Sequence, residues 1–257
     1  MSSDAPLNAC VDRILPAELA MAARVVNAIE HGSREPTPFE LSTVTGKLWK
    51  PGRTLHIRFL DGEKAVQDKI AAVAQEWMKH ANIRLEFDNA ADAEIRISFR
   101  QPGYWSALGT DALVEQFFPK NEPTMNYGAF SLSTPESEYR RVVQHEFGHA
   151  LGCIHEHQNP VAGIKWNKDV VYRDLGGPPN RWTKEQVDHN LFKAYEKTIT
   201  QFTEFDSKSI MLYAFPSSWT TDGLTFPSNT ELSETDKKFI VARYPPVTPV
   251  PSASVGG

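Results

Sequence analysis

The chain has 257 residues, of which 40% are hydrophobic, 11% aromatic and 23% charged, with 27 Lys and Arg against 32 Asp and Glu. This composition is typical of a globular protein and excludes a wholly disordered or collagen-like chain. The net charge of −5, without a long basic run, argues against a nucleic-acid partner. No run approaches the roughly 20 apolar residues of a transmembrane helix. Two cysteines are too few for a disulfide framework.

The N-terminus lacks the pattern of a signal peptide, because charged residues interrupt every apolar run there. They are Asp4, Asp12, Arg13, Glu18 and Arg24. We therefore expect a cytoplasmic protein or one exported by a non-classical route, with secretion still open. We also expect a monomer with no membrane partner.

The sequence divides into three parts. Residues 1–46 form an N-terminal extension, with a linker-like stretch at 32–38. Its helix begins at Pro16 and has an apolar stripe made of Leu19, Ala22, Ala23, Val26 and Ile29. Residues 47–245 read as one mixed α/β domain, and residues 246–257 as a disordered tail rich in Pro, Ser and Gly.

Within the domain, periodicity predicts strands at 55–60, 83–87, 93–99 and 124–132. It predicts helices at 64–80, 137–151, 168–175, 184–196 and 234–243. Ser233 is placed to cap the last of these, with Asp236 at the third helical position, where a capping box would carry Glu. The strand at 124–132 is either the exposed sheet edge along which a substrate backbone aligns or only interior scaffold. The aromatic residues Tyr104 and Trp105 are interpreted as packing residues.

The segment from 145 to 157 reads His-Glu-Phe-Gly-His-Ala-Leu-Gly-Cys-Ile-His-Glu-His. His145 and His149 are four residues apart, so on a helix both imidazoles project from one face and can bind one ion. Glu146 is placed to reach a water at that ion instead of the ion itself. Glycine readily adopts the backbone conformation that ends a helix, so Gly152 lets the chain turn back and bring His155 to the same ion. Three protein ligands leave a position open, which is typical of catalytic zinc.

This pattern, HExxHxxGxxH, resembles the metzincin metallopeptidases. Ser209-Ile-Met-Leu-Tyr213 resembles their Met-turn, in which Met211 would form an apolar floor under the histidines. Tyr213, two residues after that methionine, is typical of the astacin and serralysin branches, where it can ligate zinc and stabilise the transition state. Glu156 after the third histidine is the astacin form. In astacins this glutamate pairs with the new N-terminus after processing.

The resemblance to astacins covers about residues 47–245 and includes departures at single positions. Leu212 stands where astacins usually have His, and Cys153 stands where they usually have Phe. The astacin disulfides cannot form with two cysteines. The sequence is therefore similar to a bacterial or fungal relative of the astacins.

The resemblance implies an α+β fold with two lobes around a cleft. The upper lobe, here called the sheet lobe, would hold a twisted mixed sheet and two long helices. The lower lobe, here called the second lobe, would be irregular, with a C-terminal helix. The implied activity is zinc-dependent endopeptidase, with one catalytic Zn²⁺ per chain, a peptide or protein substrate, Glu146 as general base and acid, and Tyr213 as oxyanion donor. The alternative is a zinc-loaded, weakly catalytic module that binds peptides.

Two hypotheses concern residues near this site. Astacins and matrixins are often made in a latent form, so Cys10 or Asp12 of the extension could occupy the open zinc position. The alternative is that the N-terminal helix merely packs on the domain and that Cys10 is a small buried residue. His157 matches no motif position, and we expect it at the surface or packed around the site and not as a ligand.

Overall fold

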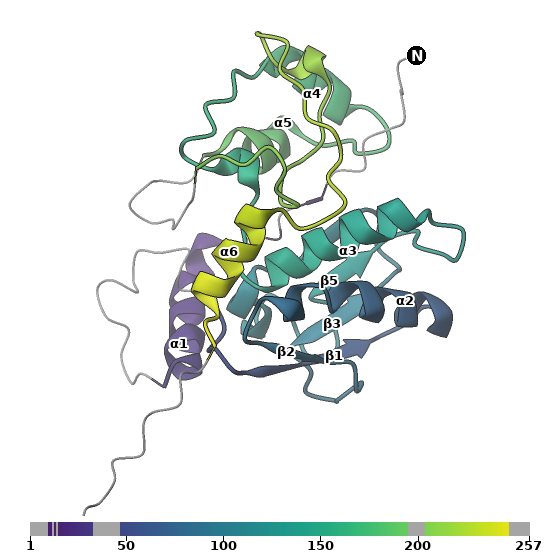
Figure 1. The fold of residues 1–257 in the computed structure, drawn as a ribbon, viewed down its shortest axis with the longest axis vertical. Helices are drawn as coiled ribbons and strands as arrows, with labels where there is room; N and C mark the ends of the chain where they lie inside the picture. Colours follow the sequence, from purple (N-terminus) through teal and green to yellow (C-terminus); the bar gives the residue numbers. More distant parts are fainter. Residues whose placement is uncertain (1–9, 12, 14, 33–46, 195–203, 247–257) are drawn as a thin grey trace, which may run out of the picture.

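The computed structural model describes residues 10, 11, 13, 15–32, 47–194 and 204–246. Figure 1 shows two lobes, with the sheet lobe in the lower half of the view and the second lobe above it. Each lobe has its own cluster of buried apolar side chains. Asp12 and nearly all of the predicted C-terminal tail lie outside the described residues. In the ranges just given, every helix is too short or too polar to cross a membrane.

A five-stranded mixed sheet forms the floor of the sheet lobe, in the order β2-β1-β3-β5-β4. β4 runs antiparallel to β5, and the other neighbours are parallel. Paired positions include His56 with Glu86, Ile57 with Ile95, Ile97 with Met125, and Trp105 with Asn126. The strands are β1 (Thr54–Phe59), β2 (Arg84–Glu86), β3 (Ile95–Ser98), β4 (Tyr104–Ser106) and β5 (Met125–Tyr127).

β4 forms one edge of the sheet, with β2 at the other, and the predicted strand at 124–132 lies at neither. β5 is the ordered part of that stretch, and it is hydrogen-bonded to β3 on one side and to β4 on the other. It is therefore interior scaffold, which was the second of the two interpretations. β4 escaped prediction because three residues are too few to show an alternating pattern.

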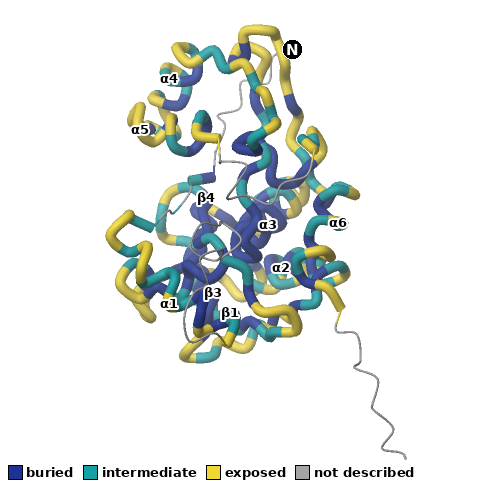
Figure 2. The backbone as a smooth tube through the Cα atoms, turned by 90° about the vertical axis from the view of Figure 1, so that its left-hand side faces the viewer, coloured by how far each residue is buried: buried dark blue, intermediate teal, exposed yellow. Residues whose placement is uncertain are grey.

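Helices α2 (Lys64–Ala74) and α3 (Glu136–Ala150) pack together over the sheet. The inward face of α2 carries Val66 and Ile70, which are almost completely buried. The predicted helix at 64–80 is interrupted after Ala74, and a 3₁₀ turn follows at Trp77–Lys79. The indole Nε1 of Trp77 donates to the carbonyl of Gln144 at 2.8 Å, which ties this turn to α3. Figure 2 shows the buried residues concentrated around α3 and the strands.

Helix α1 (Ala20–Glu30) follows a 3₁₀ turn at Ala17–Leu19, as the periodicity predicts, and the predicted stripe is half-buried except at Ile29. Ile29 is 72% exposed, whereas Glu30 is buried. Glu30 pairs with Arg53 and accepts a hydrogen bond from the backbone N–H of Lys50 at 3.0 Å. The predicted inward stripe is wrong at Ile29 because burying the Glu30 ion pair decides the rotation of the helix.

The second lobe is built from short helices and loops, as predicted. α4 (Lys168–Gly176) and α5 (Lys184–Val187) pack together, and α5 continues as a π-helical turn at Asp188–Phe192. The predicted helix at 184–196 is thus shorter than expected, and its residues 195 and 196 lie outside the described residues. A further 3₁₀ turn spans Ser217–Trp219. The core of this lobe includes Val171, Leu175, Val187, Leu191, Phe215 and Trp219.

Helix α6 (Glu234–Arg243) closes the described chain. Ser233 caps it, and Asp236 completes the capping box, as the sequence predicts. Ile240 and Tyr244 are fully buried within the core of the sheet lobe, so this helix joins that lobe by its contacts. Two 3₁₀ turns, at Gly109–Leu113 and Glu156–Gln158, complete the elements described.

Candidate zinc centre

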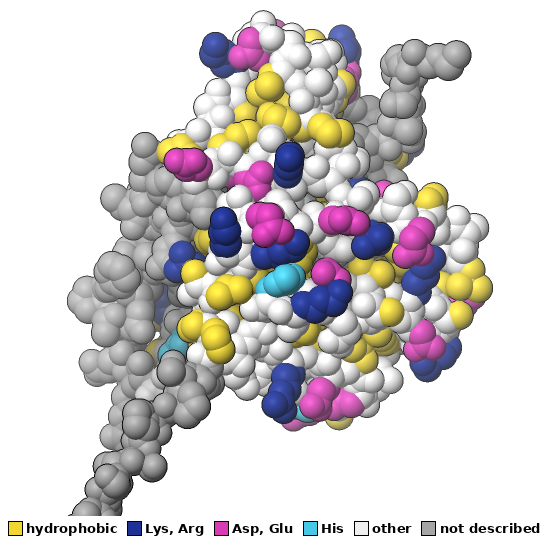
Figure 3. Space-filling view, in the orientation of Figure 1, with side chains coloured by type: hydrophobic (Ala, Val, Ile, Leu, Met, Phe, Trp, Pro, Cys, Tyr) yellow, Lys and Arg dark blue, Asp and Glu magenta, His cyan; other side chains and the backbone are white. Residues whose placement is uncertain are grey.

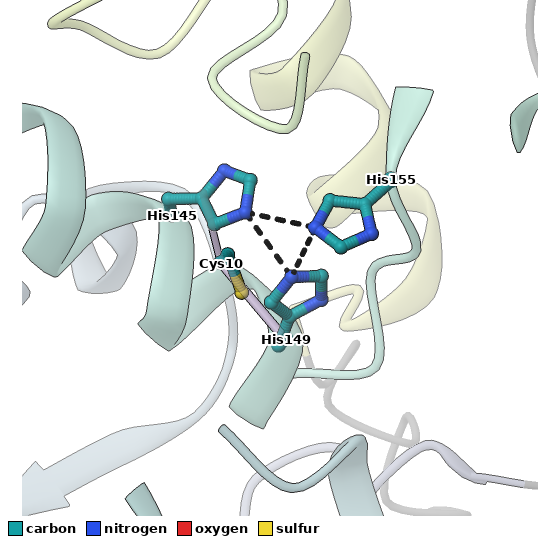
Figure 4. Close-up of side chains that lie close together, drawn as sticks. All are labelled: Cys10, His145, His149 and His155. Carbon is teal, nitrogen blue, oxygen red and sulfur yellow. Dashed lines mark hydrogen bonds between the residues drawn. The ribbon is translucent and has the colours of Figure 1, made fainter. Parts of the chain in front are cut away.

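Three histidine nitrogens converge at the end of α3. The Nε2 atoms of His145 and His149 lie 3.2 Å apart, and His155 Nε2 is 3.1 Å from His149 Nε2 and 3.2 Å from His145 Nε2. Figure 4 shows the three rings pointing toward one another, two from the helix and one from the segment that follows it. All three residues are buried. The structure therefore brings the three predicted ligands together.

Gly152 supplies the turn that brings His155 back. Its φ of +89° lies in the left-handed region, where residues with a Cβ are strained. A Cβ built there would also lie 2.9 Å from Leu48 Cδ2. The helix therefore ends just before this position, and the chain reverses in time to place His155 beside His149.

The hydrogen bonds of His145 and His149 indicate that the cluster presents its lone pairs to a cation. His145 Nδ1 lies 2.8 Å from the carbonyl of Ile210, and His149 Nδ1 lies 2.8 Å from the carbonyl of Cys153. A carbonyl only accepts, so Nδ1 carries the proton and Nε2 presents a lone pair. Burial lowers the pKa of His145, which keeps it neutral. Lone pairs converging at 3.1–3.2 Å repel one another without a cation, and tetrahedral zinc spaces two nitrogen ligands about 3.3 Å apart.

Met211 lies directly under the helix that carries the histidines. A Cβ added to Gly148 would come within 2.4 Å of Met211 Sδ, so the helix and the methionine touch at this point. The turn is held by Asp236, which accepts from the hydroxyl of Ser209 at 2.7 Å and from the N–H of Ile210 at 2.8 Å. Met211 therefore contacts the helix that carries His145 and His149, between the two histidines.

Glu146 and Tyr213 meet at a single residue, Cys10. The Cys10 thiol donates to Glu146 Oε2 at 3.4 Å, and the Tyr213 hydroxyl donates to the backbone carbonyl of Cys10. Cys10 Sγ also lies within 4.8 Å of the ligand nitrogens of the three histidines, as Figure 4 shows. The predicted base, the predicted oxyanion donor and the zinc ligands therefore surround one small volume, and Cys10 of the extension lies in it.

The extension reaches this volume along the sheet edge. Cys10 bridges Tyr104 and Arg13 bridges Ala107, both in the parallel sense. The N–H of Val11 donates to the carbonyl of Tyr104 at 3.0 Å. The described part of the extension therefore lies beside β4 and is bridged to the sheet lobe at two positions.

No protein-family model and no curated protein sequence matches the chain, whereas solved structures do. A structure of myroilysin is 43% identical, with a TM-score of 0.76, over 80% of this chain and 99% of that one. A second myroilysin structure is 39% identical, with a TM-score of 0.64, over 93% of this chain and 92% of that one.

The chain belongs to the astacin-like metzincin zinc peptidases. It is a zinc metalloendopeptidase with an α+β fold, and His145, His149 and His155 form its potential zinc site. High choriolytic enzyme 1, a hatching-enzyme zinc protease of the medaka fish Oryzias latipes, is 17% identical with a TM-score of 0.54. That match covers 78% of this chain and 95% of the hatching enzyme, and it shows a shared fold alone.

In this astacin-like peptidase, Glu156 lies in a pocket behind the histidines. The pocket is lined by residues that include Trp77, Met211, Asp236 and Phe239. Glu156 Oε1 accepts from Asn159 Nδ2 at 3.0 Å and from the N–H of Asp206 at 2.9 Å. Burial raises the pKa of Glu156 to about 7.

His157 is buried beside the site of this peptidase. Its Nε2 lies 2.8 Å from the carbonyl of Asn190, and its ring stacks on that of His155 with centroids 5.0 Å apart. It also contacts the ring of Tyr213 at 4.5 Å. Its bond to Asn190 turns Nε2 away from the histidine cluster, so the structure places His157 around the site as expected.

Sequence reasoning missed the contribution of β4 to the site of this peptidase. Tyr104 lines a pocket beside Cys10, together with Arg141 and Glu146, and Trp105 contacts the extension. The interpretation of Tyr104 and Trp105 as packing residues is incomplete, because both are buried and both also face the extension. The only available signal was the short aromatic run between Gly103 and Ala107.

Proposed function

We propose that this peptidase cleaves peptide bonds with Glu146 as general base and acid and Tyr213 as oxyanion donor, at a zinc ion held by His145, His149 and His155. The observation that supports this is the position of Cys10, whose atoms contact Glu146 and Tyr213 and lie beside all three histidines. A substrate residue in the place of Cys10 would therefore lie beside the general base, the oxyanion donor and the zinc ligands at once.

The side chains divide the chemistry as follows. Zinc, when bound, supplies Lewis acidity that polarises the scissile carbonyl and makes a water more acidic. Glu146 is 1% exposed, and its carboxylate takes the proton from the attacking water and passes it to the leaving amine. Tyr213 donates a hydrogen bond to the carbonyl oxygen as negative charge develops there, an interaction that is strongest in the transition state.

The edge of β4 would align the substrate. Its outward N–H and C=O groups pair with the extension at Cys10 and Arg13 in this structure. A peptide in their place gains the same main-chain hydrogen bonds, which is recognition by strand addition. Peptides of four or more residues in extended form are the substrates that this edge favours.

We further propose that residues 1–46 keep the enzyme latent through Cys10. Three features support this. The thiol lies at the histidine cluster, it contacts Glu146, and the carbonyl of Cys10 accepts the hydrogen bond of the Tyr213 hydroxyl. A thiolate is a strong zinc ligand that would exclude water from the open position. After removal of the extension, the carboxylate of Glu156 offers a partner for the new N-terminal ammonium, as in astacins.

Glu146→Gln tests the proposed reaction. The test uses a chain that also carries Cys10→Ser, so that the extension does not keep the enzyme latent. In this background Glu146→Gln should lower kcat by at least about 10²–10⁴-fold. The zinc content should stay near one per chain. Tyr213→Phe in the same background should lower kcat with little change in KM. Cleavage of a quenched-peptide library and zinc analysis measure both effects.

Two outcomes would contradict the proposal. Wild-type turnover in Glu146→Gln would show that another group moves the proton. Failure of the zinc-loaded Cys10→Ser chain to cleave any library peptide, while still binding peptides, would favour a weakly catalytic binding module.

A further inference from the structure

Two aromatic rings of the sheet lobe form a shelf beside the described part of the extension, whose path along β4 we call the groove. They belong to Trp105 on β4 and to Phe117, and we call them the aromatic shelf. The guanidinium carbon of Arg13 lies 4.6 Å from the centroid of Trp105 and 5.7 Å from that of Phe117. Both distances are within the roughly 6 Å at which a cation is attracted to a ring face.

The shelf belongs to the enzyme body and not to the extension. Trp105 is 3% exposed and is part of the core of the sheet lobe, where its strand is fixed by pairing with β5. Phe117 packs edge-on against buried Phe118, with centroids 4.8 Å apart. The shelf would therefore stay in place when the extension leaves.

The register places the shelf at a defined point of the groove. Cys10, at the histidine cluster, pairs with Tyr104, and Arg13 pairs with Ala107. Three residues of extended chain span about 10 Å at the usual rise per residue. The residue of a bound peptide that lies opposite Ala107 thus presents its side chain near the shelf, whichever way the peptide runs.

The contact between Arg13 and the aromatic shelf favours a guanidinium group. Among the residues that the structure describes, no carboxylate forms an ion pair with Arg13, and its Nε is buried without a hydrogen-bond partner. The ring faces therefore hold the group. A planar, weakly hydrated guanidinium stacks on aromatic faces better than the compact, strongly hydrated ammonium of lysine.

We propose that the aromatic shelf is a substrate subsite that selects an arginine side chain about three residues from the scissile bond. The extension fills this subsite with Arg13 as a substrate would. The proposal rests on the proposed function, because it requires that substrates use the groove along β4.

Competition between peptides tests this subsite in the full-length chain. The zinc-loaded Cys10→Ser protein is given mixtures of peptides that differ at one position, which holds Arg, Lys, citrulline, norleucine or Ala. Ratios of kcat/KM from one mixture are independent of the fraction of enzyme whose groove is open. Citrulline has nearly the shape of arginine without its charge, so the ratio of arginine to citrulline isolates the contribution of the cation.

We expect a preference for Arg over citrulline of about three- to tenfold at one position, two to four residues from the cleaved bond, and a smaller preference for Lys. Phe117→Leu and Trp105→Leu should each bring the ratio close to one. Phe117 is only partly buried, so its variant serves if Trp105→Leu does not fold. Phe99→Leu, an aromatic change elsewhere in the same lobe, is the control and should leave the ratio unchanged.

A measurement without turnover uses the Cys10→Ser/Glu146→Gln chain, in which the ratio of Kd values for the two peptides should show the same preference. An arginine preference that survives both shelf substitutions overturns the proposal. So does cleavage of all peptides with no preference at any position, which leaves the proposed function intact. Absence of cleavage with every peptide would instead overturn the proposed function, and the subsite proposal with it.

Discussion

At the scale of single residues, the zinc-binding segment has no free space for a side chain at Gly148, where the helix touches the methionine below it. A Cβ there would be 2.4 Å from Met211 Sδ and 3.2 Å from Trp77 Cζ2. Contacts this short require the side chain of Met211, the turn that carries it or the helix to shift. Since His145 and His149 flank Gly148 on α3, such a shift would spread their Nε2 atoms.

We expect Gly148→Ala to lower the free energy of unfolding by about 1–3 kcal/mol through overpacking, despite the higher helix propensity of alanine. Zinc affinity should fall with it. Thermal unfolding and zinc titration measure the two effects. Gly176→Ala is the control, because that glycine ends helix α4 and a Cβ there would meet only Trp182 O at 3.7 Å. Equal stability of the two variants would show that the side chain of Met211 can move away from an added Cβ at little cost.

The two neighbouring histidines should respond differently to substitution. His155→Ala removes one of three converging nitrogens, so stoichiometric zinc binding should be lost and the melting temperature should fall by linkage. His157→Gln should keep zinc near one per chain, because its Nε2 faces the carbonyl of Asn190. Zinc analysis after dialysis distinguishes the two. If only the His157 variant lost its zinc, His157 and not His155 would be the third zinc ligand.

At the scale of elements, α6 stabilises the turn under the zinc site through Asp236. Its carboxylate accepts from Ser209 and Ile210 in that turn and from the N–H of Ser233 at the start of its own helix. One buried side chain therefore joins the last helix to the loop that carries Met211. The capping box was visible in the sequence, but this second use of Asp236 was not.

Asp236→Ala should lower the free energy of unfolding by about 2–4 kcal/mol, because it leaves buried donors without an acceptor. Chemical denaturation measures this. Glu234→Ala on the same helix is the matched control: its carboxylate is 79% exposed and pairs with Lys237 at the surface, so little change in the free energy of unfolding is expected. If the two variants are equally stable, Asp236 does not hold the turn.

At the scale of the whole molecule, the extension joins distant parts of the sheet lobe. α1 is anchored by the ion pair of Glu30 with Arg53, and Cys10 lies at the histidine cluster. Figure 1 shows α1 on the flank of the sheet lobe, away from the second lobe. On the face drawn in Figure 3, acidic and basic side chains are interspersed without a large area of one sign. Specific contacts anchor the extension: the ion pair of Glu30 with Arg53, and the bridges of Cys10 and Arg13 beside β4.

Removing the extension should activate the enzyme. We expect a chain that starts near residue 40, and full-length Cys10→Ala, to cleave peptides faster than the full-length protein. With Co²⁺ in place of zinc, the full-length protein should show a thiolate-to-metal absorption band that Cys10→Ala lacks. Asp12→Ala, at a position outside the described residues, tests the other candidate. Equal activity of all four proteins, with no such band, would leave the extension as structural.

The zinc-binding residues of this protein could be predicted from the sequence, because their convergence depends on short-range spacing. His145 and His149 meet because a helix repeats every 3.6 residues, and Gly152 ends that helix in time for His155. The capping box of α6 and most strands of the sheet are equally local. Each of these features depends on residues that are close in the sequence, so the pattern of residues along the chain can predict them.

Which groups meet across long stretches of chain could not be read from the sequence and became clear from the fold. Cys10 and Glu146 are 136 residues apart, and Tyr213 reaches Cys10 across 203. The edge position of β4 depends on where the sheet stops pairing, and the outward turn of Ile29 depends on an ion pair with Arg53. Contacts of this kind come from packing and from the burial of charge, neither of which has a period in the sequence.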